Sequence, residues 1–154
     1  MALTLEQLPG WAADLLDEGR VGRLAFLDDD GRPRVLPVTY AVAAGAVWSA
    51  IDDKPKRPGE PARVRWLRSR PEAALCVDHY DDDWSRLAWV QLLGRVDVLT
   101  VGEGEEGLAA LRARYAPYRE SSPPGPLLRL VVERSLWWRS TGSPSPDHSL
   151  HDPG

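Results

Sequence analysis

The chain contains 154 residues, of which 43% are hydrophobic and 27% are charged, and its formal net charge is −4. Such a chain fits one globular domain with a single core, and its negative charge argues against a general affinity for nucleic acid. A single cysteine, Cys76, excludes an intramolecular disulfide, and no apolar run reaches the length of a membrane-spanning helix. With no signal-peptide pattern at the N-terminus, we expect a cytoplasmic protein that has neither nucleic-acid nor membrane partners.

The N-terminal third predicts one helix followed by three short strands. Over residues 4–19, Thr4 and Gln7 have the spacing of a capping box, an apolar stripe follows, and Gly19 ends the helix. Residues 20–42 predict two strands joined by a turn at DDDG (28–31), and residues 43–52 add a second turn and a third strand.

The rest of the chain predicts two helices and three longer strands. A short basic amphipathic helix spans 60–70 and ends before Pro71, strands follow at 72–80 and 85–100, and Gly94 marks a bulge in the longer one. A helix over 104–118 and a strand over 126–140 complete the pattern. Six strands with short flanking helices predict a mainly β (α+β) fold, a small barrel over residues 1–140. Residues 141–154 are rich in Ser, Pro and Gly and are predicted to form a flexible tail.

The most concentrated basic segment is DDKPKR, residues 52–57. Lys54, Lys56 and Arg57 are followed by Arg63 and Arg65 on the predicted helix. Ammonium, guanidinium and backbone N–H groups that gather where a loop enters a helix bind phosphate or carboxylate. An isolated cluster of this kind is also common as a solvated loop, so the residues alone leave both interpretations open.

The stretch DHYDDDW, residues 78–84, combines carboxylates with His79 before a predicted strand. Consecutive carboxylates do not easily all turn toward one ion, and no EF-hand spacing is present, so a metal site is the weaker interpretation. We expect a rim in which Asp81 to Asp83 stay solvated and Trp84 turns inward over a groove. His148 and His151 lie three residues apart, but within the predicted tail, so we expect no metal site there.

Motifs for nucleotide binding, nucleophilic catalysis or metal binding are absent from the sequence. It contains no P-loop, nucleophile elbow, dinucleotide-binding glycine motif or Cys/His metal spacing. With so little acid–base or nucleophilic machinery, any chemistry would come from a bound cofactor. No catalytic residue is predicted, and Tyr40 and Tyr80 are the local candidates for a proton donor.

Three segments carry a resemblance to a known family: GRLAFLDDDGRPRVLPVTYAV (22–42), AVWSAIDDKPKR (46–57) and RVRWLRSRPEAALCVDHYDDDWSRLAWVQLLGRVDVL (63–99). Over residues 18–140 the chain resembles the pyridoxamine 5′-phosphate oxidase-like split β-barrel superfamily. DDKPKR and DHYDDDWSRL resemble its actinobacterial branch, whose members are oxidoreductases that depend on the deazaflavin coenzyme F420. The resemblance implies a six-stranded FMN-binding-type split barrel that forms a homodimer with cofactor sites at the interface.

The resemblance also implies which residues contact the cofactor. The second strand would run beside the flavin or deazaflavin ring, and the third strand and the basic loop would approach the phosphate. Trp89 and Gln91 would face the cofactor from the same or the other subunit. Apart from the resemblance, the residues themselves indicate Trp84 as an aromatic wall. The candidate cofactor-binding residues are Arg34, Val35, Leu36, Pro37, Val38, Thr39, Trp48, Ser49, Lys54, Lys56, Arg57, Trp84, Trp89 and Gln91.

Two kinds of function remain open at this point. The first is an oxidoreductase that transfers a hydride between a flavin-type cofactor, F420 ahead of FMN, and an unknown small organic substrate. In such a protein, backbone donors would stabilise the reduced cofactor and the dimer groove would exclude water. The second is a non-catalytic split-barrel dimer that binds a cofactor or a haem-like ligand. A groove that is open and basic favours the first function, whereas one filled by tryptophan side chains favours the second.

Overall fold

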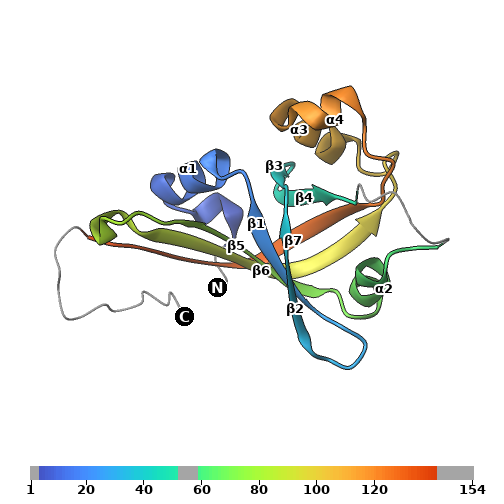
Figure 1. Ribbon diagram of the computed structural model, residues 1–154, viewed down its shortest axis with the longest axis horizontal. Coiled ribbons are helices and arrows are strands. Elements are labelled where there is room, and N and C mark those ends of the chain that lie inside the picture. Colours follow the sequence, from blue (N-terminus) through green and yellow to red (C-terminus); the bar gives the residue numbers. More distant parts are fainter. Residues whose placement is uncertain (1–3, 52–58, 142–154) are drawn as a thin grey trace.

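The computed structural model describes residues 4–51 and 59–141, and its centre is one curled antiparallel sheet, a split β-barrel (Figure 1). The order of the strands across the sheet is β2-β1-β5-β6-β7-β4-β3. The prediction of a mainly β fold with short flanking helices is therefore confirmed. The strands are β1 (Gly22–Leu27), β2 (Pro33–Val38), β3 (Ala41–Ala43), β4 (Ala46–Ala50), β5 (Glu72–His79), β6 (Ala88–Leu99) and β7 (Leu127–Arg139).

Within the described residues, six short helices flank the sheet. They are η1 (Leu5–Gln7), α1 (Gly10–Glu18), α2 (Ala62–Ser69), η2 (Trp84–Arg86), α3 (Glu105–Arg114) and α4 (Ala116–Glu120). In Figure 1, α1 lies above β5, α3 and α4 lie above β3 and β4, and α2 lies at the lower right. Within the described part of the chain, no helix has the length and apolar character needed to cross a membrane.

Two predicted helices are each divided at a proline. The first divides at Pro9 into η1 and α1, because a residue that precedes proline disfavours the helical conformation, and Leu8 is extended. The third divides at Tyr115 into α3 and α4, because Pro117 lacks an N–H and its ring would clash with the carbonyl four residues earlier. The predicted basic helix is confirmed as α2.

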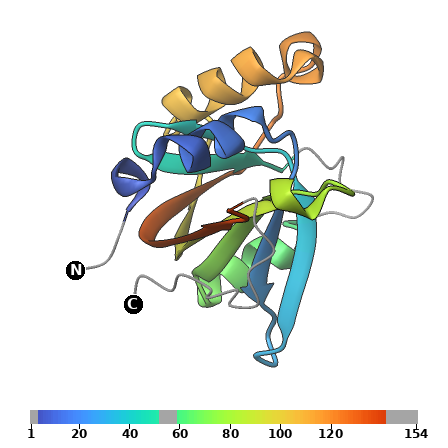
Figure 2. The same ribbon diagram turned by 90° about the vertical axis from the view of Figure 1, so that its left-hand side faces the viewer.

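The expected second strand also divides, at Thr39 and Tyr40, so residues 4–51 and 59–141 form seven strands rather than six. β2 pairs with β1, whereas β3 pairs with β4 at the other end of the sheet. The chain therefore passes from one wall of the barrel to the other at these two residues. The hairpin formed by β1 and β2 projects beyond the rest of the molecule (Figures 1 and 2).

Tyr40 anchors this crossing. Its side chain is fully buried, and its Oη donates to the carbonyl oxygen of Leu16 near the end of α1 (2.6 Å). Its backbone N–H donates to Tyr115 Oη (3.1 Å), and the Arg114 guanidinium lies 5.0 Å from the centre of its ring. Burial raises the pKa of Tyr40 to about 12. The crossing is thus tied to both α1 and the turn between α3 and α4.

Trp48 belongs to a second hydrophobic cluster on the outer side of β4. Val47 and Ser49 face the inside of the barrel, so Trp48 faces out, because side chains alternate along a strand. The ring is 1% exposed, and its Nε1 donates to the carbonyl oxygen of Ala43 (2.9 Å). Gly107 of α3 lies directly against the ring. The absence of a side chain at Gly107 therefore allows α3 to pack closely on the sheet.

The irregularity predicted at Gly94 is confirmed. The register of β6 and β7 shifts between Leu93 and Gly94, and the extra residue, Glu133, lies on β7. A Cβ atom at Gly94 would overlap the carbonyl oxygen of Val131. A glycine is therefore required where the backbone of β7 bends toward β6.

The contact between Gly107 and Trp48 yields the first prediction. In Gly107→Ala, the new methyl group would overlap the indole ring, so α3 has to move away from β4. We expect the free energy of unfolding to fall by about 1–3 kcal/mol, as for other overpacked cores, in chemical denaturation. Gly10→Ala is the matched control, because no atom lies within 4 Å of a Cβ there, and its stability should not fall. Equal stability of Gly107→Ala and wild type would contradict the close packing.

The buried phenol of Tyr40 yields the second prediction, a dependence of stability on pH. The folded state binds the phenolic proton more tightly than the unfolded state, because the pKa rises from 10.0 to about 12. This contribution, about 2–3 kcal/mol, is complete below pH 10 and is lost as the pH rises toward 12. The advantage of wild type over Tyr40→Phe in the free energy of unfolding should therefore shrink over this range. If the free energies of unfolding of the two proteins change in parallel with pH, Tyr40 is not the group responsible for the pH dependence.

Candidate functional site

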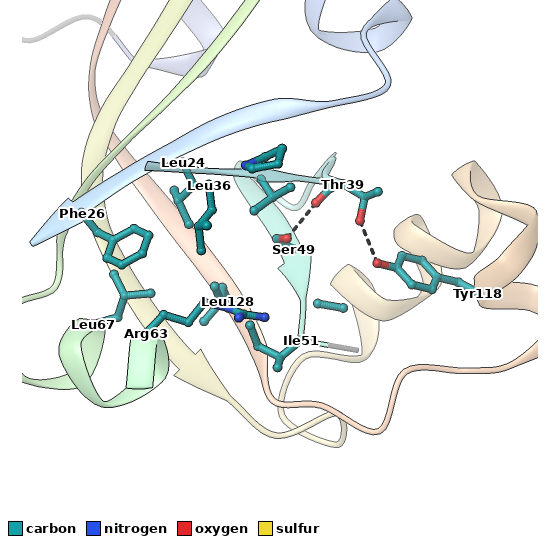
Figure 3. A pocket seen from close by; sticks show the side chains of 13 residues that line it. Leu24, Phe26, Leu36, Thr39, Ser49, Ile51, Arg63, Leu67, Tyr118 and Leu128 are labelled. Atoms are coloured by element: carbon teal, nitrogen blue, oxygen red, sulfur yellow. Dashed lines mark hydrogen bonds between the residues drawn. The ribbon is translucent and has the colours of Figure 1, made fainter. Parts of the chain in front are cut away.

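A pocket of about 350 Å³ opens where β2 diverges from β4 (Figure 3). β3 pairs with β4 at residues 46–48, so Ser49 and Ala50 extend beyond it toward β2. The walls come from both ends of the sheet, and α2 and α4 close the two sides. The residues that line the pocket are Leu24, Phe26, Leu36, Pro37, Val38, Thr39, Ser49, Ala50, Ile51, Arg63, Leu67, Tyr118 and Leu128.

Thr39 bridges the two walls at one end of the pocket. Ser49 Oγ on β4 donates to the carbonyl oxygen of Thr39 (2.7 Å). Thr39 Oγ1 lies 2.7 Å from Tyr118 Oη on α4, and either oxygen can be the donor. Figure 3 shows these three hydroxyl-bearing side chains at the same end of the pocket. We call them the hydroxyl cluster.

The opposite end of the pocket is apolar and carries one guanidinium. Phe26 and Leu67 lie there, and Leu24 and Leu36 form the wall between this end and the hydroxyl cluster (Figure 3). Arg63, on α2, extends its side chain along the pocket. The pocket therefore has an apolar surface, with hydroxyl groups toward one end and a guanidinium toward the other.

Arg34 lies on β2 but does not line the pocket. Its guanidinium lies 4.8 Å from the centre of the Trp66 ring and 3.6 Å from Asp28 Oδ2. Backbone N–H groups of Arg32 and Asp30 donate to the Asp28 carboxylate, and these bonds together with Arg34 hold its pKa below the ordinary value. The charge of Arg34 thus stabilises the turn between β1 and β2.

The backbone of β2 presents an unusual edge to β4. Asp28 N–H donates to the Arg32 carbonyl oxygen (3.0 Å), so by the alternation of an antiparallel pair residues 34, 36 and 38 bond to β1. Residues 33, 35 and 37 then direct their backbone groups to the free edge. Pro33 and Pro37 have no N–H, so Val35 supplies the N–H of this edge. The edge offers several acceptors and one donor along β2.

Lys54, Lys56 and Arg57 lie outside the described residues, as do His148 and His151. The described chain stops at Ile51, which lines the pocket, and resumes at Gly59, shortly before Arg63, which also lines it. Glu60 pairs with Arg68 on α2 (2.7 Å), and this hydrogen bond lowers the pKa of Glu60. The carboxylate of Glu60 is therefore paired with a guanidinium of α2, the helix that follows it.

The structure separates the remaining candidate residues into three places. Ser49 faces the pocket, whereas its neighbour Trp48 is buried against α3 and does not line it. Trp89 and Gln91 lie on the outer side of the barrel, because Val90 and Leu92 face the core. They pair there with Trp138 and Leu136 of β7. Within one chain, Trp48, Trp89 and Gln91 therefore do not line the pocket, whereas Ser49 and Leu36 to Thr39 do.

The acidic stretch forms a turn that bonds to itself. Asp83 Oδ1 accepts hydrogen bonds from the backbone N–H (3.1 Å) and the Oγ (2.7 Å) of Ser85, which lower its pKa. Trp84 is 69% exposed, so the expected inward turn over the groove is wrong for the single chain. Among residues 4–51 and 59–141, no group of three His, Cys, Asp or Glu side chains is placed to hold a metal ion.

Neither tyrosine considered as a proton donor reaches the pocket. Tyr40 is buried with its hydroxyl bonded to Leu16, and Tyr80 is 66% exposed and bonded to Asp82 (3.2 Å). Two residues that line the pocket are not among the predicted site residues: Tyr118, whose hydroxyl reaches it, and Arg63 of the basic helix. No sequence pattern marks Tyr118 as a site residue. It stands at the end of a predicted helix, far along the chain from the strands that it joins in the structure.

Comparisons with known proteins agree with the fold. Residues 11–139 match the family model described as pyridoxamine 5′-phosphate oxidase, and no curated protein matches the sequence. A conserved hypothetical protein of Mycobacterium tuberculosis shares 20% identity and a TM-score of 0.73 over 93% of this chain and 91% of its own. A haem-binding protein of Mycobacterium smegmatis shares 23% identity (TM-score 0.68, 88% of this chain, 57% of its own). A FAD-binding protein of Mesorhizobium loti shares 24% identity (TM-score 0.60, 83% of this chain, 92% of its own).

Proposed function

The chain belongs to the pyridoxamine 5′-phosphate oxidase family, and we propose that its pocket holds a flavin-type cofactor for hydride transfer to or from a small organic substrate. The observation that carries this proposal is the pocket itself, about 350 Å³ with apolar walls and a few convergent polar groups. Cofactor sites typically have this composition and measure about 300–1,000 Å³. The FAD-binding protein from Mesorhizobium loti, which shares the fold, supports the class of cofactor.

The residues of the pocket fit such a group. Leu24, Leu36 and Val38 form an apolar wall that suits a planar ring system. Val35 does not line the pocket, but at the free edge of β2, next to the lining residue Leu36, it offers an N–H and a C=O side by side, which suits the amide edge of a flavin or deazaflavin. Arg63 supplies a positive charge for an anionic tail, and guanidinium groups bind phosphate well.

A bound cofactor would supply the two-electron chemistry, and the protein would bind, orient and protect. The strand wall would fix the plane of the ring, and the edge of β2 would fix its rotation within that plane. The hydroxyl cluster would offer hydrogen bonds where the substrate lies. Apolar walls exclude water, which strengthens each of these electrostatic contacts.

We propose F420 ahead of FMN because DDKPKR and DHYDDDWSRL resemble the F420-dependent branch of the family. The absorbance spectrum of the purified protein, followed by titration with F420 and with FMN, tests this choice. We expect saturable binding of F420 that is tighter than that of FMN. The reverse order would assign FMN, and saturation by neither cofactor would remove the oxidoreductase proposal.

Haem is a second candidate, because the Mycobacterium smegmatis protein of the same fold is described as haem-binding. Haem iron takes His, Cys, Met or Tyr as its protein ligand. Of the described residues that line the pocket, Tyr118 alone is of these types, and its hydroxyl is bonded to Thr39. This donor set favours the flavin-type cofactor, and an intense haem band in the spectrum would reverse the preference.

We also propose that two chains form a dimer through the outer face of β5, β6 and β7. This face carries Cys76, Trp89, Leu93, Leu136 and Trp138, all partly exposed, while the described helices α1 to α4 contribute to the two hydrophobic clusters elsewhere. Aromatic residues are enriched in protein interfaces. In such a dimer, Trp89 and Gln91 would reach a cofactor as residues of the partner copy.

The charge of Arg63 yields the third prediction. If Arg63 binds the anionic tail of the cofactor, Arg63→Ala should lose a charge-assisted hydrogen bond worth about 1.5–3 kcal/mol. The dissociation constant should then rise roughly 10- to 150-fold, as measured by fluorescence titration. Arg65→Ala is the matched control, because Arg65 is an exposed residue of the same helix whose side chain donates to the carbonyl oxygen of Glu60. Equal affinities of the two variants would remove Arg63 from the site.

The outer face of the sheet yields the fourth prediction. Light scattering should give a mass of about twice 17.1 kDa for the wild type. Leu136→Glu, which places a charge on the proposed interface, should give the monomer mass. Val42→Glu is the control, because Val42 is 39% exposed on β3 and lies away from this face, and it should remain dimeric. A monomeric wild-type protein at micromolar concentration would rule out a stable dimer.

A further inference from the structure

A second pocket, of about 440 Å³, lies at the end of the sheet where β7 stops and η2 leads into β6. In Figure 1 this end of the sheet is at the left, whereas α2, which borders the first pocket, is at the lower right. The described residues that line the second pocket are 85–88 and 139–141, and none of them lines the first. The second pocket is therefore a separate place on the molecule.

Arg139 brings a guanidinium to this pocket and is held there by an aromatic ring. Ala88 pairs with Arg139 across β6 and β7. Val90 and Trp137, two residues away on each strand, pack in the core, so Arg139 lies on the inner side of the sheet, away from the proposed dimer face. Its guanidinium lies 5.0 Å from the centre of the Trp11 ring on α1. A cation over an indole ring is attracted by the π electrons, so Trp11 orients the guanidinium without neutralising its charge.

Arg86 brings a second guanidinium to the same pocket. Its side chain is 71% exposed, and among the described residues its ion pair is with Asp81 Oδ2, at 4.0 Å. So long a contact of an exposed side chain contributes little. Asp83, in the same turn, accepts hydrogen bonds from the N–H and the Oγ of Ser85. Within residues 4–51 and 59–141 no carboxylate lines the pocket, so its two guanidinium groups make it positively charged.

The donors of the second pocket suit a phosphate group better than a carboxylate. Arg86 belongs to η2 and Arg139 ends β7, so the two guanidinium groups come from different elements. Each guanidinium can donate a pair of parallel N–H bonds to an oxyanion, and two such pairs need more oxygen atoms than a planar carboxylate has. A phosphate monoester presents three acceptor oxygens and carries about 1.5–2 negative charges at neutral pH. The hydroxyl of Thr141 adds an uncharged donor.

The size of the second pocket and its apolar part suit a phosphate that belongs to a small organic molecule. Its volume of about 440 Å³ lies within the range of small-molecule sites, roughly 300–1,000 Å³. Leu87 and Ala88, both half-buried, add apolar surface beside the guanidinium groups. We propose that this pocket binds a small phosphate monoester, with the phosphate between Arg86 and Arg139 and the organic part against Leu87 and Ala88. The proposal does not depend on a cofactor in the first pocket.

The test uses the full chain in phosphate-free buffer of low ionic strength, with phenyl phosphate, inorganic phosphate and benzoate as probes. The NMR signals of the backbone amides are followed during each titration, so the place of binding is read directly. We expect saturable shifts at residues 85–88 and 139–141. Phenyl phosphate should bind more tightly than inorganic phosphate, and inorganic phosphate more tightly than benzoate. Added salt should weaken binding, because salt screens exposed charges.

Variants of the two arginines test the donors. Arg139→Ala and Arg86→Ala should each raise the dissociation constant of phenyl phosphate about 10-fold or more, because each loses a charge-assisted hydrogen bond. Arg95→Ala is the matched control, because Arg95 is an exposed residue of β6 that bonds to Glu72 (3.3 Å) and its removal changes the net charge equally. Arg63→Ala is a second control, because it removes the guanidinium of the first pocket. In both controls the affinity measured at residues 85–88 should equal that of the wild type.

Four outcomes would overturn this proposal. Shifts confined to Leu36 to Thr39 would place the phosphate in the first pocket. Equal weakening in Arg95→Ala and Arg139→Ala would attribute binding to net charge rather than to a site. Equal affinities for phenyl phosphate and inorganic phosphate would exclude an ester as the preferred ligand. Benzoate that binds as tightly as phenyl phosphate would exclude selectivity for phosphate.

Discussion

The geometry of the pocket depends on the hydrogen bonds that Thr39 makes across the split in the barrel. Its carbonyl oxygen accepts from Ser49 and its side chain bonds to Tyr118, so two strands and a helix are fastened at one point. Beyond that point β2 runs beside β1, and its other edge carries Pro33 and Pro37. Proline removes the N–H that a ladder with β4 would need. The sheet is therefore held together at Thr39 and left open along the rest of β2, and the opening is the pocket.

The helices behind β4 decide which side chains reach this opening. Trp48 fills the space between β4 and α3, and Gly107 lets the helix come close enough to cover the ring. Tyr115, at the end of α3, bonds to the backbone of Tyr40, so the turn into α4 is fixed relative to the strand crossing. Tyr118 then lies three residues further along, where its hydroxyl meets Thr39. A packing contact on the outer side of the sheet thus positions a polar group on the inner side.

The carboxylates of Asp28, Glu60 and the acidic stretch are each bonded to groups that lie close to them in the sequence. Asp28 is paired with Arg34 and with two backbone N–H groups, and Glu60 is paired with Arg68. The carboxylates of the acidic stretch bond to their own turn, with Asp83 accepting from Ser85 and Asp81 from the N–H of Asp83. These carboxylates therefore have partners near them in sequence, and Arg63 is the guanidinium that lines the pocket among the described residues.

The sequence by itself determined the local elements and the family, because both are encoded in short-range patterns. The bulge at Gly94, the helix that ends at Ser69 and the strands on either side follow from residue spacing, proline and glycine. The alternation along β4 also shows that Trp48 and Ser49 point to opposite sides. It does not show which side is the pocket, because α3, which covers Trp48, lies more than fifty residues later in the chain. The division of one predicted strand at Thr39 and Tyr40, the exposed position of Trp84 and the arrival of Tyr118 beside Thr39 likewise depend on contacts between distant segments. The tertiary structure decided these features, since the energy that fixes them comes from packing and hydrogen bonds that form only when the two walls of the barrel and the helices meet.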